Sequence, residues 1–241
     1  MNKKEIIVAI HQPNFFPWLG YFDKICKSDI FIFMDNVQFP KKSGGVWTNR
    51  VKILINGYAD WITVPIVRKY NGFKLVKEIE INDSVDWRKK MLKTIEYNYK
   101  KCPFFKEEME YIKILIYYKT QYLSDFNIHA IKFLTEHLGF DSSKFIIGSS
   151  LEVKGKGTDL LISMTKAVGG TAYLCGGGAG GYQEDYKFEE AGLKLIYQNF
   201  QHPQYLQKSV EFIPGLSIID AIFNIGSKKC FELLKSISVS L

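Results

Sequence analysis

The sequence predicts an α/β fold: a Rossmann-like, mostly parallel sheet with an inserted β-hairpin and an inserted helical subdomain. Three observations predict it. Short apolar runs alternate with amphipathic segments near the N-terminus, the same alternation returns in the C-terminal part, and the middle of the chain changes first to a period of two and then to a helical period. At 241 residues the chain is long enough for one such domain over residues 1–241.

A βαβ unit is expected at the N-terminus. The run EIIVAI, residues 5–10, is short, apolar and β-branched, which is typical of a buried strand. The next segment, WLGYFDKICK, has apolar residues at helical spacing, so we expect a helix with Asp23, Lys24 and Lys27 on its solvent side. A second apolar run, DIFIFMD at 29–35, completes the unit with a parallel strand that is buried on both faces.

The middle of the chain is expected to hold two insertions. In residues 51–82, the alternating segments RVKILING and DWITVPIV meet at Asn56 and Gly57, which predicts a hairpin, and LVKEIEIN predicts a further strand. Residues 84–138 predict three helices, because apolar residues recur there on one helical face in three successive segments. Pro103 is expected in the first turn of the second helix.

The α/β pattern resumes with a strand in KFIIGSS, residues 144–150. The segment GTDLLISMTKAVGG predicts a helix, with Thr158 as its N-cap and Gly169 just beyond its end. TAYLC and LKLIYQNF predict two more strands. SIIDAIFNIG predicts the helix that closes the domain.

Composition narrows the classes of partner. A net charge of +7 favours anionic ligands such as nucleotides or phosphosugars, although lysines that keep a surface soluble give the same total. Only Arg50, Arg68 and Arg88 are arginines, so nucleic acid is not the expected partner. The four cysteines lie far apart and indicate neither a zinc site nor disulfides. Without a membrane-spanning run or a signal peptide, we expect a cytoplasmic protein.

Polar residues at the ends of the first two strands mark the candidate site, because ligands of open parallel sheets bind outside the carboxyl ends of the strands. His11 follows the first strand, and Asp35 and Asn36 close the second. We expect His11 to act as a general base and Asp35 to orient it or to ligate a magnesium ion. A hydrogen-bonded structural histidine and an aspartate that caps a turn remain open alternatives. Lys42 and Arg50 follow in and beside the next loop, where they could hold phosphates.

The glycine run CGGGAGGY gives a second wall of the same crevice. It matches neither dinucleotide nor P-loop motifs, but it follows a predicted strand, which places Gly176 and Gly177 beside the site. Tyr182 at its end is a candidate for stacking on a base or a sugar ring. His202, in QHPQYLQ, repeats the pattern of a histidine and a proline after a strand and is a further candidate for lining the pocket.

Several of these segments together resemble one family. HQPNFFPWLGYFDKI, DNVQFPKK, NRVKI, WITVP, YLCGGGAGGY and FIPGLSIIDAIFNIG are similar to the WbqC-like protein family, in the same order over nearly the whole chain. That family is associated with bacterial O-antigen and other surface-polysaccharide gene clusters, and a glycine transferase role has been suggested for one member. The resemblance implies a cell-envelope sugar pathway and leaves the reaction open. It singles out His11, Gln12, Pro13, Asn14, Pro17, Gly20, Asp23, Lys24, Asp35, Gln38, Asn49 and Arg50.

Two departures from the family pattern affect the site. Asn36 stands where the family pattern has a second aspartate, which weakens any role that needs a carboxylate there, and the glycine run is richer than the family's. No residue is assigned as a metal ligand beyond the magnesium alternative given for Asp35. His11 and Asp35 are the predicted catalytic pair, and the predicted substrate-binding residues are Gln12, Asn14, Tyr21, Asn36, Gln38, Lys42, Asn49, Arg50, Gly176, Gly177, Tyr182 and His202.

Three functions follow as hypotheses. The first is a transferase of O-antigen biosynthesis that moves an acyl or aminoacyl group, glycyl among them, to an amino-sugar nucleotide. Its donor would be an adenylate made from ATP and Mg²⁺, an acyl thioester or an aminoacyl-tRNA. The second is an adenylate-forming or nucleotidyltransferase-like enzyme of the same pathway, by similarity of topology alone, since the histidine pair of that group is absent. The third is a non-catalytic protein that binds a sugar nucleotide.

Overall fold

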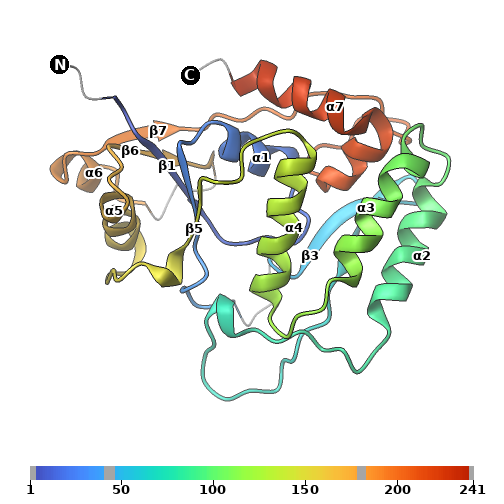
Figure 1. The fold of residues 1–241 in the computed structure, drawn as a ribbon, viewed down its shortest axis with the longest axis horizontal. Coiled ribbons are helices and arrows are strands. Elements are labelled where there is room, and N and C mark those ends of the chain that lie inside the picture. The colour runs from blue at the N-terminus through green and yellow to red at the C-terminus, as the bar shows by residue number, and fades with distance from the viewer. Residues whose placement is uncertain (1–3, 41–46, 178–182, 239–241) are drawn as a thin grey trace.

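The computed structural model describes residues 4–40, 47–177 and 183–238 (Figure 1). Within these residues, a five-stranded parallel sheet has the order β5-β2-β1-β6-β7, and a separate antiparallel hairpin pairs β3 with β4. The expected Rossmann-like α/β architecture is therefore confirmed. The strands are β1 (Ile7–His11), β2 (Ile30–Phe33), β3 (Arg50–Ile55), β4 (Tyr58–Thr63), β5 (Phe145–Ile147), β6 (Ala172–Cys175) and β7 (Lys194–Tyr197).

The helices divide into three groups in space. In Figure 1, α5 and α6 lie at one end of the molecule and α2 and α3 at the other, while α1 packs against α7. The three helices expected between residues 84 and 138 are present as α2, α3 and α4. The helices are α1 (Leu19–Cys26), α2 (Trp87–Tyr99), α3 (Phe105–Tyr117), α4 (Leu123–His137), α5 (Gly157–Ala167), α6 (Tyr186–Glu190) and α7 (Ile218–Ser238), with 3₁₀ turns at Val76–Glu78 and Gly148–Ser150.

The strand order reverses beside β1, and this reversal creates the crevice of the fold. From β1 the chain moves outward to β2 and β5 and then crosses back to β6, which pairs with the other side of β1, and on to β7. The connections that leave β1 and β6 therefore run in opposite directions along the sheet. In such sheets the ligand crevice opens at the carboxyl ends of the two strands at this switch point, here β1 and β6.

Both faces of the sheet are covered, as the continuous apolar runs predict. Val8 and Ile10 of β1 face a cluster that includes Leu160 and Met164 of α5. Ala9, which points to the opposite face, belongs to the larger cluster that takes in α1, α7, the hairpin and the three inserted helices. The inserted elements therefore share their core with one face of the sheet.

A buried polar network ties the inserted elements to α7. The hydroxyl of Tyr99 donates a hydrogen bond of 2.9 Å to Asp220 and accepts one of 2.8 Å from the backbone N–H of Leu54. The second carboxylate oxygen of Asp220 accepts from Tyr205 at 2.7 Å and from Gln207 at 3.1 Å. Burial nevertheless raises the pKa of Asp220. One carboxylate thus connects α2, the hairpin, the segment before α7 and α7 itself.

Two expectations about the middle of the chain are wrong. LVKEIEIN is not a strand: Leu75 begins a 3₁₀ turn because the Glu78 carboxylate accepts from its N–H at 2.7 Å, and the segment meets its neighbours only at isolated bridges such as Ile66 with Ile81. Pro103 lies outside α3, since Phe104 is the N-cap of that helix.

Two boundaries in the C-terminal part also differ. Lys156, not Thr158, occupies the N-cap of α5, and the Thr158 hydroxyl accepts instead from the N–H of Glu184 at 3.1 Å. The last helix does not stop at Gly226 but continues to residue 238 with a kink there, at φ +81°. A Cβ at Gly226 would lie 2.8 Å from the Phe104 ring, so glycine is needed both for the kink and for the contact.

Candidate functional site

A cavity of about 290 Å³ lies at the carboxyl ends of β1 and β6, at the switch point of the sheet. Its wall is largely apolar, with a few polar groups, which is the usual composition of a small-molecule site. The elements that reach it are the end of β1, helix α1, the loop after β2, the start of α5 and the end of β6. The lining residues are Ile10, His11, Gln12, Lys24, Met34, Val37, Gly157, Thr158, Leu160, Leu161, Tyr173, Gly176 and Gln183.

His11, the last residue of β1, is one of the residues that line the cavity. Its Nδ1 lies 3.0 Å from the carbonyl oxygen of Gln12. Because a carbonyl only accepts, Nδ1 carries the proton and Nε2 is the acceptor nitrogen, with no hydrogen-bond partner recorded among the described residues. Burial, and then the charge of Lys24, lower the pKa of His11 to about 3. At neutral pH the imidazole is uncharged and is a better hydrogen-bond acceptor than a base.

Lys24 brings the cavity its second titratable group. The side chain is 3% exposed, and its Nζ donates a hydrogen bond of 2.9 Å to the carbonyl oxygen of Ile10 and lies 5.8 Å from the centre of the Tyr173 ring. Burial lowers the pKa of Lys24 to about 8, with Cys175 acting in the opposite direction. Lys24 can therefore both lose and regain a proton near physiological pH.

The expectation that Asp23, Lys24 and Lys27 lie on the solvent side of α1 is wrong. Asp23 is fully buried, where it accepts a hydrogen bond of 2.8 Å from Gln198 and pairs with Lys27 at 3.2 Å. The helix has no exposed side here because the sheet, α7 and the chain after β7 surround it. That chain approaches closely at Gly20, where a Cβ would lie 2.7 Å from the Phe200 ring.

Asp35 does not orient His11. Its two carboxylate oxygens accept hydrogen bonds of 2.7 Å from the backbone N–H and from the hydroxyl of Ser149. These bonds join the end of β2 to the 3₁₀ turn after β5, so the carboxylate closes a loop of the sheet rather than serving the cavity. The turn that Asp35 caps follows β5 and is not the next turn along the chain, which is the alternative that the sequence left open.

Three further groups complete the cavity wall. Gln12 accepts a hydrogen bond of 3.4 Å from the Thr48 hydroxyl, and a Cβ at Gly176 would lie 4.0 Å from the Lys24 ammonium. The Oε1 atom of Gln183 is buried and has no hydrogen-bond partner within the described part of the chain. It is thus an acceptor placed for a ligand N–H or O–H. Gly157 and Thr158 add the N-terminus of α5, with its partial positive charge.

Several predicted site residues support the site from behind instead of lining it. The hydroxyl of Tyr21 donates to the Gln12 carbonyl at 3.0 Å, and its ring meets the His11 ring edge-on at 4.7 Å between centroids. Asn14 is buried outside the cavity. Asn49 is buried and donates to the Val64 carbonyl at 3.1 Å.

Other predicted residues lie away from the cavity. Gln38 is exposed and forms a single bridge with Leu75. His202 accepts from the Gly215 N–H at 3.3 Å and packs against a phenylalanine. Also outside the lining are Asn36, Gly177 and Arg50, whose guanidinium covers a tryptophan ring. Lys42 and Tyr182 lie outside the described residues.

Of the predicted candidates, His11, Gln12 and Gly176 thus meet at one cavity. Tyr173 and Gln183 were not among the sequence candidates, and Lys24 was singled out only by resemblance. A signal for Lys24 was present: WLGYFDKIC carries bulky apolar residues on nearly every side, which is typical of a helix with no exposed face. A lysine in such a helix must find a buried acceptor.

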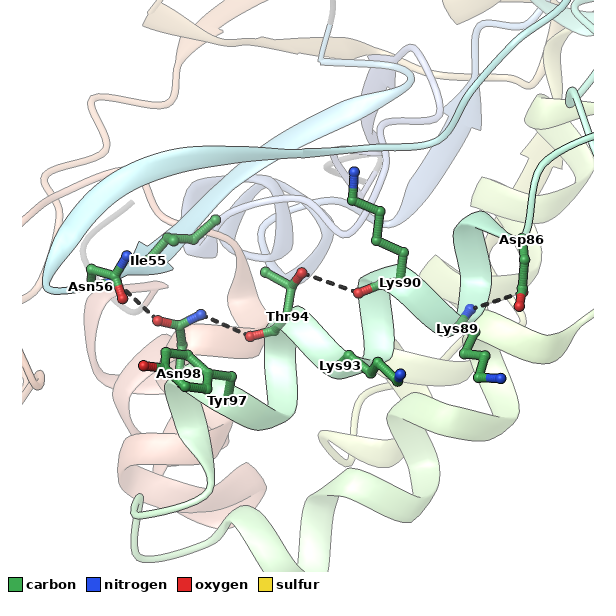
Figure 2. Close-up of a pocket in the computed structure, with 9 residues that line it drawn as sticks. All are labelled: Ile55, Asn56, Asp86, Lys89, Lys90, Lys93, Thr94, Tyr97 and Asn98. Carbon is green, nitrogen blue, oxygen red and sulfur yellow. Dashed lines mark hydrogen bonds between the residues drawn. The ribbon is translucent and has the colours of Figure 1, made fainter.

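A larger but more open groove runs along α2 and the tip of the hairpin (Figure 2). Its volume is about 740 Å³, and its polar groups already bond to one another, with Asn98 donating to the Thr94 carbonyl at 2.8 Å. Figure 2 shows Lys90 reaching toward the hairpin, while Lys89 and Lys93 point away from it. The lysines do not converge on one point, so we assign the candidate site to the smaller cavity.

Comparison with known proteins agrees with the resemblance seen in the sequence. The model of the WbqC-like protein family matches residues 12–231. The chain is also 30% identical over 224 residues to Uncharacterized protein Rv1507c of Mycobacterium tuberculosis (strain ATCC 25618 / H37Rv), which covers 92% of this chain and 94% of that protein. No solved structure matches the chain at a significant level. No helix in the described ranges has the length and apolar character needed to cross a membrane. The chain belongs to the WbqC-like protein family.

Proposed function

We propose that this protein is a transferase of surface-polysaccharide (O-antigen) biosynthesis that moves a small acyl or aminoacyl group to the amine of an amino-sugar nucleotide. One observation carries the chemistry: a neutral His11 and a lysine with a pKa near 8 share a cavity at the switch point of the sheet. The pathway rests on the family alone. The proposal also places the protein in the cytoplasm, where nucleotide-linked sugars are made.

His11 and Lys24 have separate roles in the acylation of the amine. Nε2 of His11 accepts a hydrogen bond from the acceptor amine and so directs its lone pair toward the acyl carbon. As the new C–N bond forms and the bond to the donor's leaving group breaks, the amine's proton passes to the neutral form of Lys24. A pKa near 8 suits this role, because proton transfer is most effective when the pKa of the base is close to the working pH.

The size of the cavity limits what it holds. A volume of about 290 Å³ is just below the range for small-molecule sites, roughly 300–1,000 Å³. It accommodates a short acyl group and the amine-bearing part of a sugar, but not a complete nucleotide sugar. A small donor group such as glycyl therefore fits better than a long acyl chain, and the nucleotide must lie outside this cavity.

The low pKa of His11 favours a second candidate, a non-catalytic protein that binds an amino-sugar nucleotide. In that case His11 only accepts a hydrogen bond, and Lys24 holds the anionic part of the ligand. The two candidates differ in whether a new covalent bond is made.

Mass spectrometry separates them. The protein is incubated with UDP- and dTDP-linked amino sugars and, in turn, with ATP, Mg²⁺ and an amino acid, with an acyl thioester, and with an aminoacyl-tRNA. A transferase adds the mass of the acyl group to one of the sugars, Lys24→Met abolishes the product, and the exposed-surface control Lys229→Met does not. Binding of the amino-sugar nucleotide without a mass change under any donor would overturn the transferase and support the binding protein.

A further inference from the structure

A line of tryptophan rings begins beside His11 and leads away from the cavity. The rings of Trp18, Trp47 and Trp61 follow one another with centroids 5.2 Å apart at each step, and the Trp18 ring lies 6.1 Å from the His11 ring. We call these three residues the tryptophan ladder. Each of the three residues is half-buried.

The ladder is assembled from three separate segments. Trp18 is the N-cap of α1, Trp47 precedes β3 and Trp61 lies in β4. The carbonyl of Trp47 accepts a hydrogen bond of 3.0 Å from the N–H of Phe15, which fixes the middle of the ladder to the segment after β1. The fold thus holds the three rings at a defined position relative to His11.

The far end of the ladder is cationic. The Arg50 guanidinium lies 4.3 Å and the Lys52 ammonium 5.3 Å from the centre of the Trp61 ring. Lys52 is the cross-strand partner of Trp61, so the β3–β4 pairing fixes this contact. The Nε atom of Arg50 is buried with no hydrogen-bond partner among the described residues, which leaves a donor available for an anion.

A hollow of about 410 Å³ adjoins Trp61 between β4 and α2. Trp61 and Trp87 give it two aromatic walls, and Lys90 gives it a further cation. Figure 2 shows the Lys90 side chain reaching from α2 toward the hairpin, and Lys90 lines both this hollow and the open groove beside it. A flat ring and a phosphate therefore find complementary groups within this one region.

We propose that the tryptophan ladder, with Arg50, Lys52 and Lys90, binds the nucleoside diphosphate part of an anionic ligand. The base stacks on the Trp61 end of the ladder and the phosphates pair with the cations. The inference rests on the proposed function in one respect: the attached sugar then extends along Trp47 and Trp18 toward His11. It also explains how a cavity of this size serves a much longer ligand.

The distribution of charge favours this ligand over two others. A neutral oligosaccharide could stack on the rings but gains nothing from Arg50 and Lys52. A single-stranded nucleic acid needs cations along the whole track. Among the described residues, the cations recorded over ladder rings all lie at Trp61, and His11 at the opposite end is neutral. The cations gathered at Trp61 match the diphosphate, and the Trp47 and Trp18 rings, over which no cation is recorded among the described residues, match the attached sugar.

Isothermal titration calorimetry of the whole chain with UDP tests the site. UDP binds, uridine and pyrophosphate bind more weakly, and maltohexaose does not bind. Trp61→Ala weakens UDP binding about tenfold, as expected for the loss of one base-stacking ring, whereas Trp61→Phe stays within about threefold of wild type. Arg50→Gln and Lys90→Gln weaken it without removing a ring, so the test does not depend on one variant folding. Lys229→Met, with the same loss of charge on α7, leaves binding unchanged.

Three results would overturn the inference: unchanged UDP affinity in Trp61→Ala and Arg50→Gln, binding of maltohexaose as tight as UDP, or a single-stranded RNA bound tenfold more tightly than UDP. Gly176→Leu separates this inference from the proposed function, because its side chain projects toward Lys24 and fills the cavity. If no transfer is ever detected but Gly176→Leu still binds UDP, the nucleotide site at the ladder is supported and the transferase proposal is not. If transfer occurs and Trp61→Ala leaves the KM for the sugar nucleotide unchanged, only the ladder fails.

Discussion

The ammonium group of Lys24 donates a hydrogen bond of 2.9 Å to the carbonyl oxygen of Ile10, the residue directly before His11. This bond holds a buried cation at the end of β1, where its charge is one of the causes of the low pKa of His11. Burial lowers the pKa of Lys24 itself to about 8. A ligand that brings negative charge into the cavity raises both pKa values, so binding and proton transfer are coupled at this site.

Removing the charge of Lys24 raises the pKa of His11. In Lys24→Met we expect the pKa to rise above 3 but to stay below 6.5, because burial is the larger cause and is retained. The chemical shift of the His11 ring during an NMR pH titration measures it. Lys229→Met, at an exposed lysine of α7, is the control with the same loss of charge, since Lys229 is not among the causes of the shift. An unchanged His11 titration in Lys24→Met would contradict the coupling.

His11 makes the fold sensitive to acid. Its pKa is about 3 in the folded state against 6.5 for an ordinary histidine, so the unfolded chain takes up the proton first as the pH falls below 6.5. Stability drops from pH 6.5 downward by up to about 1.4 kcal/mol per pH unit, or about 2 kcal/mol by pH 5. Urea unfolding at pH 6.5 and at pH 5 measures this loss of stability, which should be smaller in His11→Gln. Equal losses in both proteins would show that His11 is not the neutral histidine of low pKa described above.

Asp35 is expected to matter for stability more than for turnover. Asp35→Ala leaves the N–H and the hydroxyl of Ser149 without their acceptor, which should lower the free energy of unfolding by about 2–4 kcal/mol. Ser149→Ala removes only one of the two bonds and should cost less. Transfer activity per folded molecule should change little in both variants. A stable but inactive Asp35→Asn protein would restore the catalytic role that the sequence predicts.

Tyr99 holds the inserted helices to the rest of the fold. Tyr99→Phe leaves the N–H of Leu54 without its acceptor and removes one donor to Asp220, so we expect a loss of about 1–3 kcal/mol in urea unfolding. Tyr58→Phe, at an exposed tyrosine of the hairpin, is the control and should change stability by less than about 0.5 kcal/mol. Similar losses in the two variants would rule out the network as a structural tie.

Local pattern was enough to predict the sheet and the positions of His11 and Gly176. The apolar runs at residues 5–10 and 29–35 form neighbouring parallel strands, and His11 lies at the carboxyl end expected of it. His11 and Gly176 line the same cavity because the strands that they follow or end, β1 and β6, are adjacent in the sheet. The periodicity of the three inserted helices was also sufficient, since each has one face in the core.

The rest of the site depends on contacts between distant segments. Periodicity places Asp23 and Lys24 on the outside of α1, and it fails because Gln198, far along the chain, covers that side and bonds to Asp23. Likewise, Asp35 lies near His11 in the sequence pattern, but its oxygens are taken by Ser149 of another loop. Such partners are fixed by the packing of the whole fold and not by the spacing around each residue.

The most direct test of the proposed function is the ¹⁵N NMR shift of Nε2 of His11 during titration with a UDP-linked amino sugar. If the acceptor amine donates to this nitrogen, its signal moves upfield with the amino sugar and scarcely moves with UDP, while the Nε2 signal of His202, outside the cavity, stays constant in both. An Nε2 signal that does not respond to a bound amino-sugar nucleotide would contradict the assignment of this cavity as the acceptor site.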